Sequence, residues 1–455
     1  MSDRLWLNRR AFIRSAGLTA LAGAATSGAS LVSPASASAA TLEQMGSTTF
    51  DFDTVYDRHD TDCSKWDSII ERYGRENIEV AMGVADMDFR AAPAITRALA
   101  ERCKHENWGY LRTPPAFFKA IADWNQRRYG LEVDPESIEL SDGVHPALIA
   151  ALHAFAPQGS KVLLTTSTYS GFYGDLRATQ TLPENSPMIV ENGVHRFDFD
   201  DLESRMGHDT DVLILCNPQN PTGNCWSRED LLRVGQMCLE RRVVVLADEI
   251  HCDFVTKGNK YTPFASLPDK DVVANSVTFK AASKTFSLAA MKVAWFFSTN
   301  PAYMDMIRFH HRAATNTLGV AANHGALTEG EGWLDQLLVY LDGNHSFAEE
   351  YIRENIPGIE YTKAQGTYLA WLDVSGLADR IGAAATAAEQ SKNAPRPVTP
   401  ETVVGNWLIE HAKVYTNAGS SYGPGGEGHM RMNLGTSRSL IKVALDNIAE
   451  AVSKA

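Results

Sequence analysis

Three short polar segments of this sequence carry residue types that could act on a small molecule. They are residues 217–223 (Asn-Pro-Gln-Asn-Pro-Thr-Gly), 247–251 (Ala-Asp-Glu-Ile-His) and 281–286 (Ala-Ala-Ser-Lys-Thr-Phe). Asp248 closes an apolar run, where a carboxylate is costly unless a cation or a hydrogen-bond donor meets it. Lys284 offers an amine that can act as a nucleophile or a base. Taken singly, the segments could equally be a tight turn, a strand end and a solvated loop.

The apolar runs predict the elements that would position these residues. Between residues 93 and 298, helical stretches alternate with short apolar runs, at 162–165, 212–216, 243–247, 272–278 and 293–297. This alternation is typical of an α/β fold with a mainly parallel sheet. Ligands of such sheets lie at the carboxyl ends of the strands. Asn217, Asp248 and Lys284 are therefore expected at one edge of the sheet.

The rest of the chain divides into segments of different character. Residues 91–320 are predicted to form the large domain, and residues 321–455 a smaller α+β domain with a strand at 367–372. The Ala-rich stretch 381–393, which leads into a Pro-rich turn, is interpreted as an exposed insertion. Residues 40–90 are interpreted as an N-terminal arm that packs on the small domain or on a partner subunit.

The first 39 residues have the pattern of an export signal. Arg9-Arg10 is followed by Phe12, Ile13 and Arg14, then by a weakly apolar stretch and Ala-x-Ala sites. This pattern favours the twin-arginine route over an ordinary Sec signal and predicts a periplasmic or secreted bacterial protein. The apolar stretch is too weak for a membrane anchor, and no other stretch resembles a membrane span.

Composition narrows the range of partners. The formal net charge of -13 makes nucleic acid an unfavourable partner. The six cysteines lack Cys-x-x-Cys spacing, so neither a metal site nor a disulfide framework is predicted. Cys216 and Cys252 flank apolar runs and are expected to be buried thiols.

The three segments, in this order, resemble the motifs of fold-type-I enzymes that use pyridoxal 5'-phosphate (PLP). The chain is most similar to MalY/PatB-type cystathionine β-lyases, also called carbon–sulfur lyases. Further strings that carry the resemblance are 50–53 (Phe-Asp-Phe-Asp), 65–67 (Lys-Trp-Asp), 84–89 (Val-Ala-Asp-Met-Asp-Phe), 108–110 (Trp-Gly-Tyr) and 366–373 (Gly-Thr-Tyr-Leu-Ala-Trp-Leu-Asp). The resemblance implies the aspartate-aminotransferase fold, with a large domain and a smaller one.

The resemblance also implies how the cofactor ring is held. Lys284, next to Ser283, would carry PLP as a Schiff base, and Asp248 would pair with the pyridinium nitrogen. Asn220 and His251 would bond the phenolic oxygen of the ring, and Tyr169 would stack on the pyridine. A carboxylate beside the ring nitrogen keeps it protonated, so that the ring can accept electrons.

Three further expectations concern the phosphate and the substrate. Backbone amides of Gly143, Val144 and His145, before the apolar helix predicted at 146–155, would face the phosphate. By resemblance, Tyr110 would reach the phosphate of a neighbouring subunit, which implies a homodimer with shared sites. Arg431, with Ala85 and Asn220, would bind the substrate, the arginine holding the α-carboxylate of an amino acid in bidentate fashion.

The chain also departs from the family pattern. Gly83 stands where lyases of this type usually have a Trp, which suggests a different preference for the substrate side chain. Gln219 replaces a frequent His, and Ala281 and Lys292 stand where aminotransferases usually place a Ser and an Arg on the phosphate. The last two changes argue against the classical aminotransferase branch, although Lys292 could still contribute charge to the phosphate.

The leading functional hypothesis is β-elimination from cystathionine or a cysteine-S-conjugate, which yields pyruvate, ammonia and a thiol. Lys284 would remove the Cα proton. Transamination, racemisation and cyclisation begin with the same proton transfer, so these outcomes remain open alternatives. A PLP-binding regulator without catalysis is a further alternative, which the intact lysine and the export signal disfavour.

Overall fold

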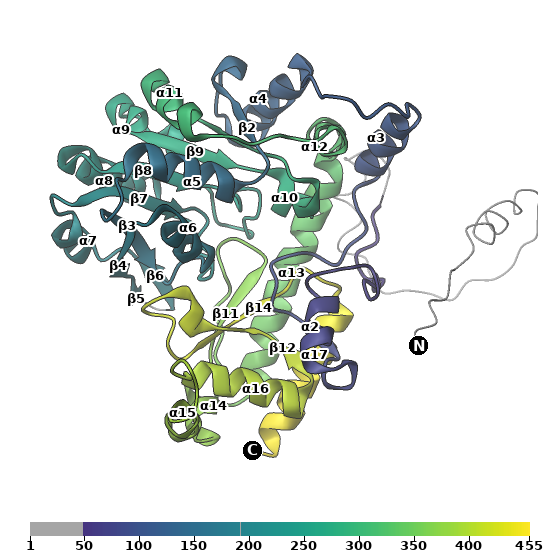
Figure 1. Cartoon of the computed structure of the whole chain (residues 1–455). Helices are drawn as coiled ribbons and strands as arrows, with labels where there is room; N and C mark the ends of the chain where they lie inside the picture. The colour runs from purple at the N-terminus through teal and green to yellow at the C-terminus, as the bar shows by residue number, and fades with distance from the viewer. Residues whose placement is uncertain (1–48, 192) are drawn as a thin grey trace, which may run out of the picture. The chain divides into compact units, whose positions relative to one another are not determined.

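The computed structural model describes residues 49–191 and 193–455, so the predicted export signal lies outside the described residues. A seven-stranded sheet in the order β2-β10-β9-β8-β7-β3-β4 forms the centre of the large domain (Figure 1). Its strands are β2 (Glu139–Ser141), β3 (Lys161–Thr166), β4 (Leu182–Pro187), β7 (Thr210–Cys216), β8 (Val244–Asp248), β9 (Ser276–Lys280) and β10 (Ala294–Phe297). Strand β10 runs antiparallel to both neighbours, while β4, β3, β7, β8 and β9 are parallel. The mainly parallel sheet that the sequence predicts is confirmed.

Helices cover both faces of this sheet, which explains why its strands are apolar on both sides. Val212 and Ile214 of β7 pack with α5 (Val144–Phe155), α6 (Gly171–Thr179) and α11 (Pro301–His310). Leu213 and Leu215 point the other way, toward α7 (Phe199–Arg205), α8 (Arg228–Arg241) and α9 (Lys270–Ala274). Successive side chains of a strand thus enter two separate cores.

The apolar run at residues 272–278 spans two elements. Val272 and Val273 belong to helix α9, and the strand within the run, β9, begins at Ser276. The Asp269 side chain caps α9 by accepting hydrogen bonds from the amides of Asp271 and Val272. A buried helical turn followed at once by a buried strand produces one uninterrupted apolar run, which periodicity cannot divide.

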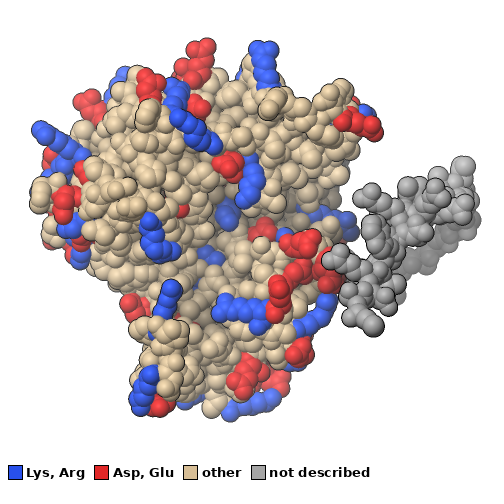
Figure 2. Space-filling view, in the orientation of Figure 1, with Lys and Arg blue, Asp and Glu red and all other residues tan. Residues whose placement is uncertain are grey.

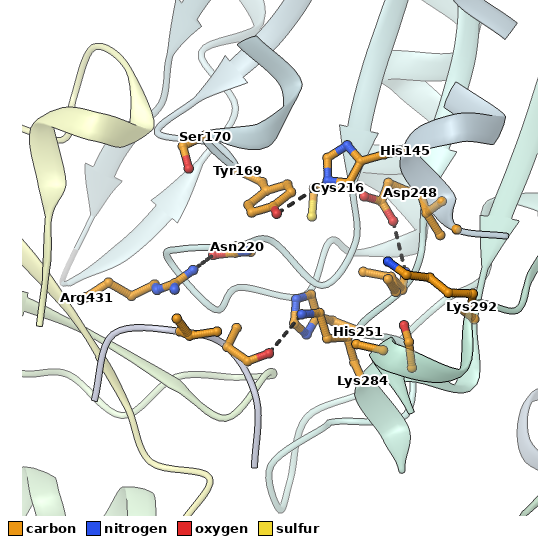
Figure 3. Close-up of a pocket in the computed structure, with 18 of the residues that line it drawn as sticks. His145, Tyr169, Ser170, Cys216, Asn220, Asp248, His251, Lys284, Lys292 and Arg431 are labelled. Atoms are coloured by element: carbon orange, nitrogen blue, oxygen red, sulfur yellow. Dashed lines mark hydrogen bonds between the residues drawn. The ribbon is translucent and has the colours of Figure 1, made fainter. Parts of the chain in front are cut away.

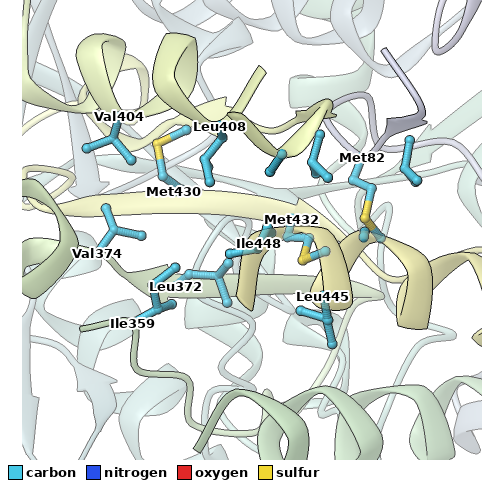
Figure 4. Packing of buried hydrophobic residues seen from close by; sticks show 14 of the residues in the cluster. Met82, Ile359, Leu372, Val374, Val404, Leu408, Met430, Met432, Leu445 and Ile448 are labelled. Atoms are coloured by element: carbon cyan, nitrogen blue, oxygen red, sulfur yellow. The ribbon is translucent and has the colours of Figure 1, made fainter. Parts of the chain in front are cut away.

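The small domain is built on an antiparallel sheet in the order β11-β14-β13, with β11 (Leu369–Asp373), β14 (His429–Asn433) and β13 (Asn417–Ala418). Met430 and Met432 of β14 and Leu372 of β11 lie on its buried face, as Figure 4 shows. Helices α14 (Ser375–Arg380), α15 (Ala383–Ser391), α16 (Pro400–Ala412) and α17 (Arg438–Ser453) surround this core. The core fixes β14, and therefore the position of its inward-facing residue Arg431.

The N-terminal segment joins this same core. Trp66 and Ile69, at the start of α2 (Asp67–Tyr73), are buried in it, and β1 (Val80–Ala81) pairs in parallel with β12 (Val414–Tyr415). The structure therefore places the segment on the small domain of its own chain. This placement brings the residues directly after β1 to the edge of the large domain.

Four further helices are α3 (Pro93–Cys103), α4 (Pro115–Tyr129), α12 (Thr317–Glu329) and α13 (Glu331–Asn355), and a separate two-stranded sheet consists of β5 (Ile189–Glu191) and β6 (Val194–Arg196). The long helix α13 runs from the large sheet to the small domain (Figure 1). Residues 49–455 form a single compact unit, and the boundaries near residues 90 and 320 stay predictions. None of the helices within the described ranges combines the length and apolar character needed to cross a membrane.

Two smaller predictions can be compared with the structure. The stretch 381–393 is not simply an exposed insertion, because Ala383 and Ala387 of α15 are buried in the small-domain core. These two residues are four positions apart and therefore share one face of the helix. In a stretch made mostly of alanine, hydropathy does not distinguish this buried face from the exposed one. Cys216 and Cys252 are buried and unpaired with another cysteine, as predicted.

Candidate active site

A cavity of about 370 Å³ lies where the carboxyl ends of β7 and β8 meet the small domain. Figure 2 shows this side of the molecule hollowed between the two domains, with Lys or Arg side chains visible inside. The cavity is lined by nearly all of the predicted site residues, namely Ala85, Gly143, Val144, His145, Tyr169, Asn220, Asp248, His251, Ser283, Lys284 and Arg431. Residues from both domains therefore meet at the expected edge of the sheet.

Tyr110 is the one predicted site residue that does not line the cavity. It lies after α3, and its side chain is fully exposed. Trp108, two residues earlier, is also largely exposed. The guanidinium of Arg102 lies over the Trp108 ring, 4.7 Å from its centre, whereas the Tyr110 side chain projects into solvent. A contact of Tyr110 with the cofactor of a second subunit stays a prediction.

Asp248 is the last residue of β8 and reaches the cavity floor (Figure 3). Its carboxylate is buried and accepts one hydrogen bond, 3.1 Å long, from the backbone amide of Ile250. No Lys, Arg or His of the described chain forms an ion pair with it. Burial raises the pKa of Asp248 to about 6, although the charge of His145 opposes the rise. Within the described chain, this carboxylate is therefore buried without an ion-pair partner.

Lys284 lies on the short helix α10 (Ala282–Thr285), after β9, and points into the same cavity (Figure 3). Its Nζ donates a 2.8 Å hydrogen bond to the carbonyl of Ala85. Burial, followed by the charge of Arg431, lowers the pKa of Lys284 to about 8. No carboxylate lies within ion-pair distance among the described residues. A substantial fraction of neutral amine is therefore present near neutral pH, as a nucleophile or base requires.

Arg431 enters the cavity from β14 of the small domain. Its guanidinium is buried and donates to Asn220 Oδ1 at 3.0 Å and to the carbonyl of Gly83 at 2.6 Å. It lies 5.1 Å from the centre of the Tyr422 ring, and its Nε has no partner. The described structure offers this guanidinium no carboxylate. A buried arginine with free donors is suited to a carboxylate supplied by a ligand.

The N-terminus of α5 opens into the cavity and suits an anion. Val144 and His145 are its first residues, Gly143 precedes it, and no side chain caps its amides. A Cβ at Gly143 would lie 3.2 Å from Pro146 Cδ. The helix begins two residues before the predicted start, so the amides of Val144 and His145 belong to its first turn. Free amides at a helix start bind phosphate groups well.

His251 and Lys292 complete the polar wall. His251 is buried, and its Nδ1 has no hydrogen-bond partner in the described chain. Burial, with the nearby charges of Lys284 and Arg431, lowers the pKa of His251 well below the usual range. The imidazole is thus neutral, with a nitrogen free to bond a ligand. Lys292 also lines the cavity, as its possible contribution to a phosphate requires.

Gly83 leaves no open space at its own position in the structure. A Cβ at this position would lie 2.2 Å from Cε1 of Tyr415 and 2.6 Å from Oδ1 of Asn417. The space that a side chain would take is thus already filled by two residues of the small domain. Asn417 lines the cavity and is the cross-strand neighbour of Arg431 in the sheet. Its amide side chain therefore forms part of the wall that a larger side chain at position 83 would otherwise form.

Sequence reasoning missed several residues of the site. Asn417 and Tyr422 line the cavity, and Nδ2 of Asn417 donates to the Tyr422 hydroxyl at 3.0 Å. The backbone carbonyl of Tyr422 accepts a 2.8 Å hydrogen bond from the amide of Thr168, which joins the two domains at the cavity mouth. Their only sequence signal is proximity to Arg431, because β13 is two residues long and lacks an apolar run.

Comparison with known proteins identifies the family. The model of aminotransferases of class I and II matches residues 77–448, and the chain belongs to this family. It is 37% identical to the cystathionine beta-lyase PatB of Bacillus subtilis, over 88% of this chain and 100% of that protein. It is 27% identical to the protein MalY of Escherichia coli, over 89% of this chain and 99% of that protein.

Solved structures agree on the fold. The PLP-bound C-S lyase of Staphylococcus hominis superposes with a TM-score of 0.79 at 27% identity, covering 89% of this chain and 99% of the other. Cystalysin of Treponema denticola, whose structure contains PLP, gives a TM-score of 0.81 at 24% identity and covers 90% and 100%. The predicted aspartate-aminotransferase-like fold, with a large and a smaller domain, is therefore confirmed.

Proposed function

We propose that this protein is a PLP-dependent carbon–sulfur β-lyase that acts on an L-amino acid such as cystathionine or a cysteine-S-conjugate. The observation that carries the proposal is the convergence of three charged groups that have no ionic partner among the described residues. Asp248 and Arg431 are buried, Lys284 is half-buried, and all three line one cavity without the opposite charge that such an environment demands. The identity of 37% to PatB along that protein's whole length supports the choice of reaction.

The cavity fits the cofactor group by group. Asp248 would meet the ring N–H, His251 Nδ1 and Asn220 are placed for the ring oxygen, and Tyr169 lies on the cavity wall as a stacking partner. The amides at the start of α5, with Ser283 and Lys292, would hold the phosphate. Lys284 would form the covalent link. When bound, PLP supplies an acceptor for the electron pair that is left at the substrate Cα.

The residues of the chain perform the remaining tasks. Arg431 would bind the α-carboxylate, with Ala85 and Asn220 around it, and thereby place the Cα hydrogen beside Lys284. The Lys284 amine would take the Cα proton, and the Cβ–S bond would break with departure of the thiolate. Addition of one water then gives pyruvate and ammonia, and the thiolate leaves as a thiol after protonation.

A second outcome is supported by a different relative. The aspartate aminotransferase of Pyrococcus horikoshii is 21% identical over 86% of this chain. Transamination would use the same three charged groups, so the site does not separate it from elimination. Elimination is preferred because PatB and MalY match nearly end to end at higher identity.

Two proposals concern the cellular form. Arg9-Arg10 and the following stretch support export through the twin-arginine route to the periplasm or the exterior, with residues 1–39 removed. The exposed rings of Trp108 and Tyr110 support a homodimer in which this segment reaches the second subunit. Mass spectrometry of the protein from culture medium and periplasm tests the first, and sedimentation of wild type and Tyr110→Ala the second.

The decisive experiment identifies both the link and the reaction. The protein is loaded with PLP, reduced with borohydride and digested, and the adduct is expected on the peptide that contains Lys284. Lys284→Ala should lose this adduct and lower pyruvate release from L-cystathionine by roughly 10³-fold or more. Lys292→Met, which removes another cavity lysine, should keep the adduct on Lys284.

A substrate panel separates the outcomes. L-cystathionine, cysteine-S-conjugates and pairs of amino acid and keto acid are supplied, and pyruvate, thiol, new amino acid and racemised substrate are measured. Pyruvate with equimolar thiol supports the lyase, and amino transfer without thiol supports the aminotransferase. PLP binding with no turnover of any substrate would leave a regulatory protein and would contradict the proposal.

A further inference from the structure

The side chain of His145 has a built environment that its proposed backbone role does not explain. Its Nδ1 lies 2.6 Å from Oδ2 of Asp175, and its Nε2 lies 3.4 Å from the Tyr169 hydroxyl. The Asp175 side chain is 7% exposed, whereas the imidazole is 41% exposed and lines the cavity. A buried carboxylate thus fixes one ring nitrogen while the rest of the ring faces the site.

The neighbouring backbone makes room for this imidazole. A Cβ at Gly171 would lie 2.6 Å from His145 Cε1 and 2.5 Å from Tyr169 Cε1. Any side chain at position 171 would therefore displace one of the two rings. The Asp175 carboxylate comes from α6, which begins at Gly171, so one element supplies both the space and the anchor.

Figure 3 shows the imidazole of His145 beside the carboxylate of Asp248, at the end of the cavity remote from Arg431. The two groups interact electrostatically: each stabilises the charged form of the other. Burial alone would lower the pKa of His145, but the hydrogen bond and charge of Asp175 outweigh it and raise that pKa. The hydrogen bond and the charge of Asp175 thus favour the protonated form of the imidazole beside Asp248.

We propose that His145, held by Asp175, is a positioning residue that keeps Asp248 ionised and thereby ready to accept the ring N–H of the cofactor. The inference rests on the proposed PLP site. Asp248 is buried and has no cation in ion-pair contact within the described chain, so the imidazolium, which lies beside it without forming an ion pair, supplies positive charge from the side. Asp175 acts through His145, because it orients the ring and favours its protonated form.

Other charged or titratable groups share this environment and bear on its pH dependence. The groups that face the His145–Asp248 pair are Tyr169 and Asp175 around α6, Cys216 at the end of β7, Glu249 next to Asp248, Lys284 on α10, and Asp142 and Lys292 on the cavity wall. Each remains in place when His145 alone is replaced. A change in pH dependence on replacing His145 can therefore be assigned to the imidazole.

The sign of the effect follows from burial. Without the imidazolium, less positive charge opposes the effect of burial on the pKa of Asp248. Its carboxyl therefore keeps its proton to a higher pH. A protonated carboxyl cannot pair with the ring N–H, so PLP affinity should begin to fall at a higher pH. In the unmodified chain the fall is expected below about pH 6, the pKa of Asp248.

The test is a titration of the whole chain, freed of cofactor, with PLP between pH 5 and 9, followed by quenching of protein fluorescence. In His145→Gln, the pH midpoint of the dissociation constant should move up by about one unit. Asp175→Asn should move it in the same direction by less. His153→Gln serves as the matched control, because His153 is an exposed histidine of the same helix.

A second probe isolates the ring nitrogen. The 1-deaza analogue of PLP has carbon at that position but the same phosphate and aldehyde, so its binding should show no shift in His145→Gln. An equal shift with both probes would mean that His145 acts on the phosphate or on Lys284, which would overturn the inference. Unchanged midpoints with PLP would overturn it too. Failure of the unmodified chain to bind PLP would instead refute the proposed function.

Discussion

Two adjacent carboxylates and two nearby lysines occupy opposite environments in this molecule. Asp248 and Lys284 face the cavity, and neither has an ionic partner among the described residues. Glu249 and Lys280 lie behind the cavity, 3.8 Å apart and almost completely buried. Because neighbouring residues of a strand end point in opposite directions, the same backbone serves both regions.

Behind the cavity, both charged side chains have an ionic partner and hydrogen-bond partners. Glu249 accepts hydrogen bonds from the Tyr261 hydroxyl and, at 2.7 Å, from the amide of Phe264. Lys280 donates to Asn125 Oδ1 at 2.9 Å and lies 4.1 Å from the centre of the Tyr129 ring. The pair is enclosed by partners from α4 and from the chain between β8 and α9, so it holds these segments together.

The contrast teaches how a buried charge can be interpreted. A buried pair whose hydrogen bonds are complete is structural, since removal of either partner leaves an uncompensated charge. A buried charge with missing partners lowers stability, and it is retained where a ligand supplies the partner. Mutations should therefore change stability in opposite directions in the two regions, although the residues are of the same types.

The largest effect is expected from breaking the paired region. Glu249→Gln should lower the free energy of unfolding by about 3–5 kcal/mol, because Lys280 stays buried without its carboxylate. Denaturant unfolding followed by circular dichroism measures the change. The double variant Glu249→Gln/Lys280→Met should recover part of the loss, because no unpaired charge remains.

The exposed pair Arg97–Glu329 provides a control for the loss of any ion pair. Both side chains are more than 60% exposed, at 63% and 62%. Glu329→Gln should change the free energy of unfolding by at most about 1 kcal/mol. If Glu249→Gln were equally mild, the distinction between the two buried regions would fail.

The cavity should give the opposite sign in the cofactor-free protein. The pKa of Lys284 in the folded chain, about 8, is below the ordinary lysine value of 10.5. The folded state therefore disfavours the ammonium, and stability is lost as the pH falls from 10.5 toward 8. At pH 7, Lys284→Met should raise the free energy of unfolding by up to about 3 kcal/mol. Solvation of the ammonium by water in the cavity would reduce this gain. Denaturant unfolding of both proteins at pH 7 and pH 10.5 measures this difference; it should shrink at the higher pH.

The same contrast explains what the sequence could predict. Asn217, Asp248 and Lys284 were predicted at one edge of the sheet because each closes or follows an apolar run, whereas the role of His251 rested on the family resemblance. Asn417 and Asp175 were missed, since β13 has only two residues and Asp175 lies within the amphipathic helix α6. Such residues reach the site through tertiary packing, which leaves no local periodicity.

Of the two cavity variants, Asp248→Asn should give the smaller and the more diagnostic effect. The folded pKa of Asp248 is about 6, above the ordinary aspartate value of 3.8, so the free energy of unfolding falls as the pH rises from 3.8 to 6. In the cofactor-free protein, wild type and variant should be equally stable near pH 4, and the variant should gain about 2–3 kcal/mol by pH 7. Loading with PLP should cancel or reverse the gain, because only wild type then pairs with the ring nitrogen. A gain that persisted after loading would mean that Asp248 meets no cation in the bound state. The distinction between buried charges that a ligand pairs and buried charges that the protein itself pairs would then not apply to this residue.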